Sequence, residues 1–208
     1  MSFAIANVLN SNSVNTTVKR VKEDVSIVLK EPNFQSHSEI EMQGEKTVEE
    51  ELEEFLDEIK KSKNFLVLSE EQKEFILKIL TEIYKTKWRN PWFKIPNSLI
   101  LAQSILESWW GKSEYIMERN NPFWIYSKKN KKLVLKRFNS LGEAIKYYLT
   151  NLENHNAYKS LQTLIFNDEE PSSDELIEHL DSYSEDPKYK DKLRGILNSY
   201  GLKEYDAL

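Results

Sequence analysis

The sequence predicts a mainly α domain of the α+β type, into which one β-hairpin is inserted between helices. Two observations lead to this fold class. Three Ser-x-x-Glu/Gln capping boxes, at Ser69–Gln72, Ser140–Glu143 and Ser172–Glu175, each precede apolar residues at spacings of three and four. Between the first two boxes, residues 123–138 change to the aromatic and β-branched composition of paired strands.

Composition narrows the classes of protein and of site. The 208 residues carry a formal net charge of −5, so the basic excess typical of nucleic-acid-binding domains is missing. No cysteine is present and the three histidines lie far apart, which excludes thiolate sites and argues against any metal site. No run approaches the roughly 18 apolar residues of a membrane span, and residues 1–10 lack the basic start of a signal peptide. We expect a monomer without a metal site or a nucleic-acid partner.

The N-terminal part is predicted to lie outside the main domain, which spans residues 65–208. Residues 1–44 are rich in Ser, Asn and Thr and are expected to form a disordered tail, in which Val25–Leu29 has the pattern of a short strand. Residues 45–64 are expected to form an acidic amphipathic helix and a linker. Two interpretations of this helix remain open: it docks on the main domain, or it is an acidic arm that binds a partner. Its thin apolar face consists of Val48, Leu52, Leu56 and Ile59.

Two helices are expected on either side of Pro91 and Pro96. The first runs from Ser69 to about Lys87. The second covers Asn97–Trp110, the most apolar helix of the chain, and Gly111 stands where a C′ glycine ends a helix. Because a helix that is apolar on most faces is normally buried, we expect Asn97–Trp110 at the centre of the domain.

The hairpin and the last helix complete the domain. Phe123–Tyr126 and Leu133–Phe138 are the expected strands. The basic residues at the tip either solvate an exposed edge or line a groove for an acidic polymer. Asp186, followed by Pro187, opens the last helix, and Gly201 ends it.

Glu107 is the candidate for acid–base chemistry. It lies near the C-terminal end of the apolar helix, beside Leu106, Trp109 and Trp110. Burial among such side chains disfavours the ionised carboxylate and raises its pKa, which is what a general acid needs near neutral pH. The alternative is a helix-terminal glutamate at the surface, and the residues alone leave both interpretations open.

Several motifs resemble those of a known family. The run Ala102-Gln-Ser-Ile-Leu-Glu-Ser-Trp-Trp-Gly111 is similar to the catalytic helix of bacterial glucosaminidases of glycoside hydrolase family 73. Asn120-Asn-Pro-Phe123 resembles the Asn-Asn-x-Phe motif of that family. Asn151-Leu-Glu-Asn-His-Asn-Ala-Tyr158 and Asp186-Pro-Lys-Tyr-Lys-Asp-Lys-Leu193 resemble stretches of its Bax-like subgroup. The matches keep the same order over about residues 65–205.

The resemblance implies a lysozyme-like fold and hydrolysis of N-acetylglucosaminyl β-1,4 linkages in peptidoglycan or a related amino-sugar polymer. Glu107 matches the family's general acid, and Tyr189, in preference to Tyr183, matches a tyrosine that lines the catalytic cleft. No cofactor is implied, and such a substrate lies outside the cytoplasm, in the periplasm or cell wall. Packing in the core is the alternative for each aromatic candidate. The residues expected to bind substrate are Trp110, Asn121, Phe123, Trp124, Tyr126 and Tyr183.

Two positions carry more bulk than the family pattern. Trp109 stands where the family usually has the glycine before its Trp-Gly pair. Trp124 stands where it usually has the glycine after Asn-Asn-x-Phe. These side chains either reshape a sugar-binding subsite or block it.

A second catalytic carboxylate is missing from the hairpin. Glycosidases commonly use two carboxyl groups about 5–9.5 Å apart, and many relatives carry the second on the hairpin. Residues 123–138 contain no Asp or Glu. Three explanations remain open: the 2-acetamido group of the substrate acts as nucleophile, Glu114 or Glu118 serves, or the protein is a catalytically degenerate lysozyme-like domain that binds cell-wall glycan.

Overall fold

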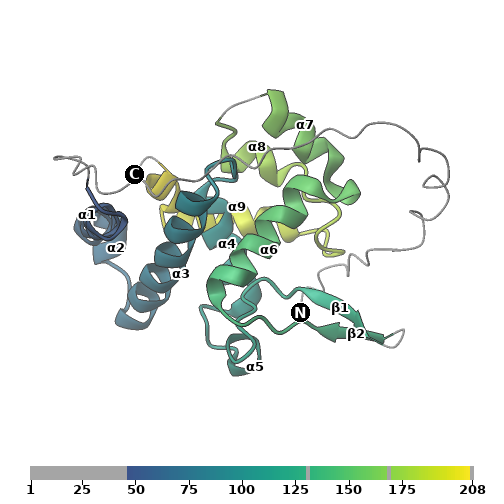
Figure 1. Ribbon diagram of the computed structural model, residues 1–208, viewed down its shortest axis with the longest axis horizontal. Helices are drawn as coiled ribbons and strands as arrows, with labels where there is room; N and C mark the ends of the chain where they lie inside the picture. Colours follow the sequence, from purple (N-terminus) through teal and green to yellow (C-terminus); the bar gives the residue numbers. More distant parts are fainter. Residues whose placement is uncertain (1–45, 130–131, 168–169, 207–208) are drawn as a thin grey trace, which may run out of the picture.

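Helix α4 (Asn97–Ser108) lies at the centre of the fold, as the computed structural model shows (Figure 1). The structure describes residues 46–129, 132–167 and 170–206. Ten of the twelve α4 residues are buried, because the helix is apolar on most faces and other helices cover it. The predicted mainly α architecture with one inserted hairpin is confirmed.

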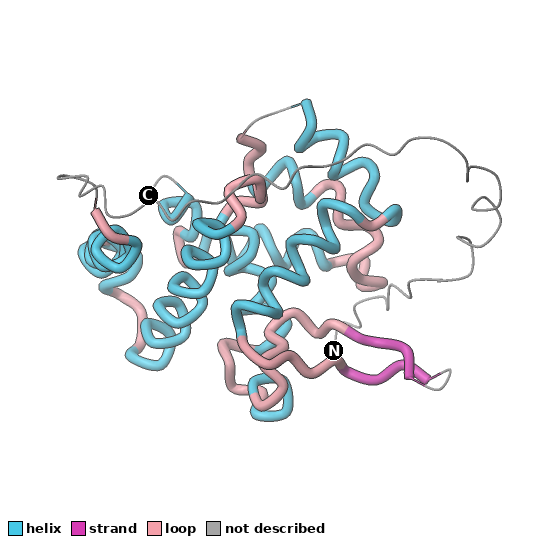
Figure 2. The backbone as a smooth tube through the Cα atoms, in the orientation of Figure 1, coloured by secondary structure: helices cyan, strands magenta, loops and turns pink. Residues whose placement is uncertain are grey.

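The other elements surround α4. Helices α3, α8 and α9 and the 3-10 helix η2 pack directly on it, while α1 and α6 pack on α3. The two-stranded hairpin projects away from the helices (Figure 2). The bounds are α1 Val48–Lys61, α2 Lys63–Leu66, α3 Glu70–Arg89, α5 Glu114–Met117, β1 Tyr126–Lys129, β2 Lys132–Leu135, α6 Leu141–Asn154, η1 Asn156–Tyr158, α7 Lys159–Asn167, α8 Ser173–Ile177, α9 Tyr189–Ser199 and η2 Leu202–Asp206.

The predicted helix starts follow local capping signals. Ser69–Gln72 and Ser172–Glu175 form complete capping boxes, in which each side chain accepts the other residue's backbone N–H. At Ser140 the hydroxyl accepts the N–H of Glu143, but the Glu143 carboxylate instead accepts the N–H of Asn139 at 2.8 Å. The local signal therefore places the helix start correctly even where only half of the box forms.

The acidic helix α1 docks on α3. A capping box at Thr47–Glu50 begins it. Phe55 rather than Leu56 is buried, and its ring centroid lies 5.2 Å from that of Tyr84. The apolar face thus packs on the rest of the protein, in agreement with the docking interpretation. Its buried residues are Leu52, Phe55 and Ile59.

Part of the N-terminal prediction lies outside the described residues. This holds for the expected tail, residues 1–44, and for the strand at Val25–Leu29. The boundary at residue 65 stays a prediction, and α1 contributes to the same hydrophobic core as α4. Across the described ranges, no helix combines the length and apolarity that spanning a bilayer requires.

Helix α4 ends two residues earlier than predicted. Trp109 adopts the left-handed conformation with φ 55° and ψ 52°, and Trp110 and Gly111 follow with φ 60° and 71°. Ser108 stabilises this turn, because its Oγ accepts the N–H of Gly111 at 2.9 Å. A Cβ at Gly111 would lie 2.8 Å from the ring of Phe75. A left-handed turn of three residues therefore ends the helix, rather than a single C′ glycine.

The hairpin forms, but its strands lie closer to the tip than predicted. Strands β1 and β2 pair antiparallel, with Tyr126 opposite Leu135. Residues 123–125 do not extend β1, because Trp124 has φ 55° and the Asn121 side chain bonds both the N–H and the carbonyl of Ile125. The same side-chain amide also donates to the carbonyl of Lys136 at 2.9 Å, which closes the base of the hairpin.

The last helix also begins later than predicted. Residues 186–188 form a turn, in which Asp186 accepts the N–H of Lys188 on its carboxylate and the N–H of Tyr189 on its carbonyl. Gly201, with φ 59°, follows the helix as expected. Helices α5 and α7 were not predicted, because α5 has four residues and α7 fully buries Leu161 alone.

The N-terminus of α4 is capped by a residue far along the chain. Pro96, at the cap position, offers no side-chain hydrogen bond. Instead, Asp206 in η2 accepts the N–H of Ser98 at 2.7 Å and its hydroxyl at 2.6 Å. Asn97 donates to the carbonyl of Tyr205 at 2.9 Å. An acidic group at this end also complements the helix dipole, so η2 stabilises the start of the helix whose last turn carries Glu107.

Candidate active site

Glu107 is a buried carboxyl group in the last turn of α4. Its exposed fraction is 9%, and among the described residues its buried Oε1 has no hydrogen-bond partner. Burial raises the pKa of Glu107 to about 8, although hydrogen bonding with Tyr189 and the positive charge of Lys192 act in the opposite direction. The carboxyl group is therefore mostly protonated at neutral pH, as a general acid must be.

Three buried tyrosines lie around this carboxyl group. Tyr148 comes from α6, Tyr183 from the segment before α9 and Tyr189 from the first turn of α9. The ring of Tyr183 stacks on that of Tyr189 at 5.6 Å and meets that of Tyr148 edge-on at 6.3 Å. Burial, together with the nearby charge of Glu107, raises the pKa of all three phenols well above 10. They remain neutral hydroxyl groups at physiological pH.

Gln103 connects two of these tyrosines. Its Nε2 donates to the Tyr189 hydroxyl at 2.9 Å, and its Oε1 accepts from the Tyr148 hydroxyl. Because the Tyr189 oxygen accepts from Gln103, its own proton is free to be donated towards Glu107. The roles of Gln103 and Tyr148 were not predicted from the sequence. The available signal for Gln103 was its position four residues before Glu107, which places both on one helix face.

Gln103→Leu is expected to destabilise the protein and to change the pH dependence of its activity. Two buried tyrosine hydroxyls lose their partner, at about 1–3 kcal/mol each. Without Gln103, the Tyr189 hydroxyl is no longer oriented towards Glu107. Because hydrogen bonding with Tyr189 lowers the pKa of Glu107, its loss should raise that pKa, and activity that needs protonated Glu107 should persist to higher pH. Urea unfolding and a pH–rate profile measure the two effects.

Gln162→Leu is the matched control for this prediction. Gln162 is half-buried and donates to two backbone carbonyls, those of Leu152 and His155, rather than to Tyr148 or Tyr189. We expect it to lower stability without moving the pH profile. Equal pH profiles for Gln103→Leu and wild type would contradict the orienting role of Gln103.

Asn121 and Phe123 lie in the segment that joins the hairpin to the buried tyrosines. Both are fully buried. The Phe123 ring stacks on Tyr148 at 4.2 Å and 15°, and its carbonyl accepts from the Tyr183 hydroxyl at 2.9 Å. These expected substrate-binding residues therefore connect the hairpin base to the tyrosines, and in this structure the Phe123 ring has no exposed face for a sugar.

The remaining aromatic candidates differ in exposure. Trp110 is half-buried and packs edge-on against Phe75 at 6.0 Å and Tyr200 at 4.7 Å, so it serves the core. Trp124 and Tyr126 are also half-buried and meet edge-on at 6.3 Å. The Nε1 of Trp124 is buried and has no hydrogen-bond partner within the described part of the chain.

Strained backbone is concentrated next to Glu107 and Phe123. The described non-glycine residues with positive φ are Trp109, Trp110, Asn120 and Trp124. The left-handed conformation costs about 1–2 kcal/mol for a residue with a Cβ, and asparagine adopts it most readily. Trp109 and Trp124 are the two positions at which the resemblance described above leads us to expect glycine.

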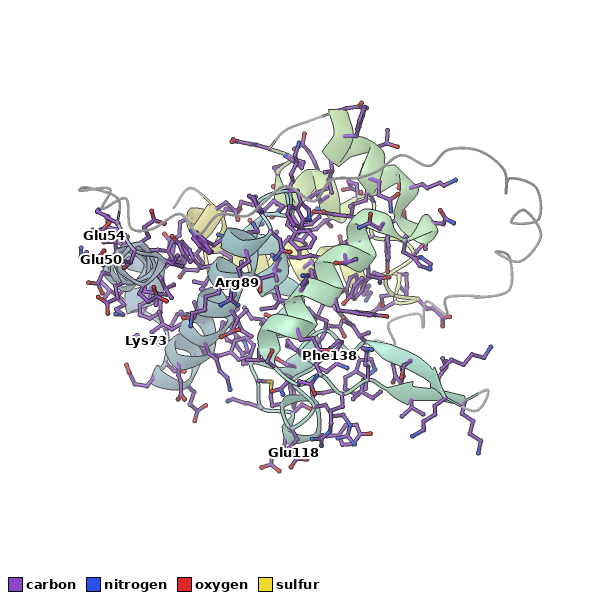
Figure 3. The ribbon with its side chains drawn as sticks, viewed as in Figure 1. Glu50, Glu54, Lys73, Arg89, Glu118 and Phe138 are labelled. Carbon is purple, nitrogen blue, oxygen red and sulfur yellow. The ribbon has the colours of Figure 1, made fainter. Side chains whose placement is uncertain are left out.

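No second carboxylate lies on the described hairpin, and other candidates are exposed. Glu114 is the first residue of α5, and Glu118 directly follows this helix. Figure 3 shows Glu118 at the periphery of the molecule. Both side chains are exposed, so neither of them shares the burial of Glu107. Among the described residues, no group of three or more His, Asp and Glu is placed to hold a metal ion.

Comparisons with known proteins identify the family of this chain. The model of the glucosaminidase family, described as mannosyl-glycoprotein endo-beta-N-acetylglucosaminidase, matches residues 90–202, a range that contains the whole site. Protein bax of Escherichia coli is 30% identical over 131 residues, covering 52% of this chain and 48% of that protein. The chain thus spans about half the length of the curated relative it matches.

Two solved structures are similar to this chain. The catalytic domain of the autolysin Auto from Listeria monocytogenes matches with a TM-score of 0.55 and 21% identity, over 78% of this chain and 99% of that domain. A C-terminally truncated glycoside hydrolase domain of FlgJ from Salmonella typhimurium matches with a TM-score of 0.45 and 20% identity, over 66% and 99%. The first match shows a shared fold.

Proposed function

The chain belongs to the glucosaminidase family and has its mainly α, lysozyme-like fold; on this premise we propose that it hydrolyses N-acetylglucosaminyl β-1,4 linkages in peptidoglycan. The observation that supports the proposal most is the buried Glu107 carboxyl group, whose pKa is raised to about 8. A group that is protonated at neutral pH can donate its proton to the leaving glycosidic oxygen.

In the proposed reaction, Glu107 protonates the glycosidic oxygen while the bond from that oxygen to C1 breaks. Because residues 123–138 contain no carboxylate, we propose that the carbonyl oxygen of the substrate's 2-acetamido group attacks C1 and forms a cyclic oxazolinium. Water then opens this ring and gives a proton to the Glu107 carboxylate. The acid is thereby restored, and Tyr189 keeps its carboxyl group oriented.

A glycan-binding module without hydrolytic activity is the second candidate. The missing hairpin carboxylate favours it, as do the bulky side chains at Trp109 and Trp124. The buried and protonated state of Glu107 favours the hydrolase, because binding alone needs no carboxyl group that is kept neutral at a cost in stability.

Digestion of purified peptidoglycan, followed by borohydride reduction and mass spectrometry, separates the two candidates. The proposal expects new reduced ends at N-acetylglucosamine, and expects that N-deacetylated peptidoglycan resists cleavage because it lacks the assisting acetamido group. Reduced ends at N-acetylmuramic acid would contradict the linkage. No cleavage, with retention of the protein on the same glycan, would favour the binding module. Since peptidoglycan lies outside the cytoplasm, the proposal also places the protein in the periplasm or cell wall.

A further inference from the structure

Trp109 and Trp124 combine features that stability alone does not explain. Both have φ 55°, a conformation in which bulky side chains are genuine outliers. Trp110 has nearly the same φ, but its ring packs between Phe75 and Tyr200, and this packing offsets the strain. The Trp109 side chain gains no such packing, since 76% of it is exposed.

Trp124 carries an additional cost. Besides the strained backbone, its indole N–H is buried and has no acceptor among the described residues. A buried donor without a partner is unfavourable. The residue is only partly buried, and its ring lies edge-on to that of Tyr126. Glycine at position 124 would therefore leave less backbone strain than tryptophan does.

Both tryptophans are close in sequence to members of the buried cluster around Glu107. Trp109 follows Glu107 by two residues, at the turn that ends α4. Trp124 directly follows Phe123, whose carbonyl accepts from Tyr183 and whose ring stacks on Tyr148. Each ring is thus carried by a residue within two positions of a member of the cluster.

We propose that Trp109 and Trp124 are specificity-determining residues whose rings stack on sugar rings of the glycan that Glu107 cleaves. Indole rings present flat apolar faces, which match the apolar C–H faces of pyranose rings, and binding sites commonly use aromatic walls of this kind. The inference rests on the proposed function. It adds that the protein keeps strained backbone at two positions in exchange for glycan binding.

The test compares Trp109→Gly and Trp124→Gly with wild type in thermal stability, peptidoglycan binding, KM and kcat. Because glycine relieves the strain, we expect both variants to melt at or above the wild-type temperature. Binding should weaken about 3- to 10-fold per ring, as expected for the loss of one aromatic contact. KM should rise accordingly, with kcat changed less than KM. A lower melting temperature with unchanged KM and binding would show a structural role and overturn the proposal.

Trp92→Gly is the matched control. Trp92 is 62% exposed, lies in a turn with ordinary φ, and precedes the N-terminal end of α4, at the other end of the helix from Glu107. We expect it to leave binding and KM unchanged.

The outcomes also separate this inference from the proposed function. If wild type binds peptidoglycan without cleaving it, and the two glycine variants bind more weakly, the hydrolase proposal fails and the inference stands. If wild type neither binds nor cleaves the glycan, both fail. Cleavage by wild type with equal KM for all variants retains the function and removes the inference.

Discussion

Replacing Glu107 with glutamine is expected to reduce kcat on peptidoglycan by about 10²- to 10⁴-fold, the contribution that general acid catalysis usually makes. Glutamine keeps the size of the side chain but has no proton to donate to the leaving oxygen. Wild-type activity should be constant below neutral pH and should fall as pH rises through about 8, where Glu107 ionises. A pH–rate profile measures this limit, and the variant's residual activity should not show it.

The same substitution is expected to stabilise the protein at alkaline pH. Because burial raises the folded-state pKa of Glu107 from 4.5 to about 8, the folded protein holds the proton more tightly than the unfolded chain, and stability falls as pH rises between these values. At 1.36 kcal/mol per pKa unit, ionisation costs up to about 5 kcal/mol. Glutamine avoids this cost, so the melting temperature of the variant should exceed that of wild type by roughly 5–15 °C at pH 9.

Thermal unfolding at pH 5, 7 and 9 tests the stability effect. The difference between Glu107→Gln and wild type should grow with pH. Glu74→Gln, an exposed position on α3, is the control and should leave activity unchanged. A Glu107→Gln variant that still cleaves glycan at the wild-type rate would remove Glu107 from the role of acid.

Phe123→Ala is expected to destabilise the protein by about 3–5 kcal/mol, the usual cost of deleting a fully buried phenyl ring. The substitution leaves a cavity against Tyr148, on which the ring stacks. The loop that supplies the carbonyl acceptor of Tyr183 then loses its anchor in the core. Because this loop supports the tyrosines around Glu107, activity should fall even where the protein remains folded.

Urea unfolding measures this loss of stability. Phe166→Ala is the control, because Phe166 is 88% exposed and its removal should change stability by no more than about 0.5 kcal/mol. A change below about 1 kcal/mol for Phe123→Ala would contradict the structural role assigned to its ring. Phe123→Leu, which retains most of the apolar volume, should recover most of the stability.

The fold was predictable wherever one local interaction decides it. Ser69 and Ser172 cap the helices that follow them, and both partners of each cap lie within four residues. The strand positions were not predictable in this way. They depend on Asn121, whose side chain bonds Lys136 fifteen residues further along the chain. Alternation of side chains along the sequence does not reveal such a contact.

In the site, too, local features were predictable from the sequence and long-range contacts were not. Glu107 could be chosen from its apolar neighbours on one helix, and its burial agrees with that choice. The interaction of Gln103 with Tyr148 and Tyr189 joins three helices, so only the tertiary structure reveals it. For Phe123, sequence reasoning recognised an aromatic residue near the site but could not distinguish a wall of the core from an exposed sugar-binding surface.

During translation, helix α4 is synthesised well before the residue that caps its N-terminus. Ser98 and its partner Asp206 are separated by 108 residues. At roughly 5–20 residues per second, the ribosome adds Asp206 about 5–20 s after Ser98. During this time the helix that carries Glu107 is already made but lacks its N-terminal cap, and α9, which supplies Tyr189, follows it by a similar delay. The nascent chain can therefore complete the arrangement around Glu107 only after α9 and η2 have been synthesised.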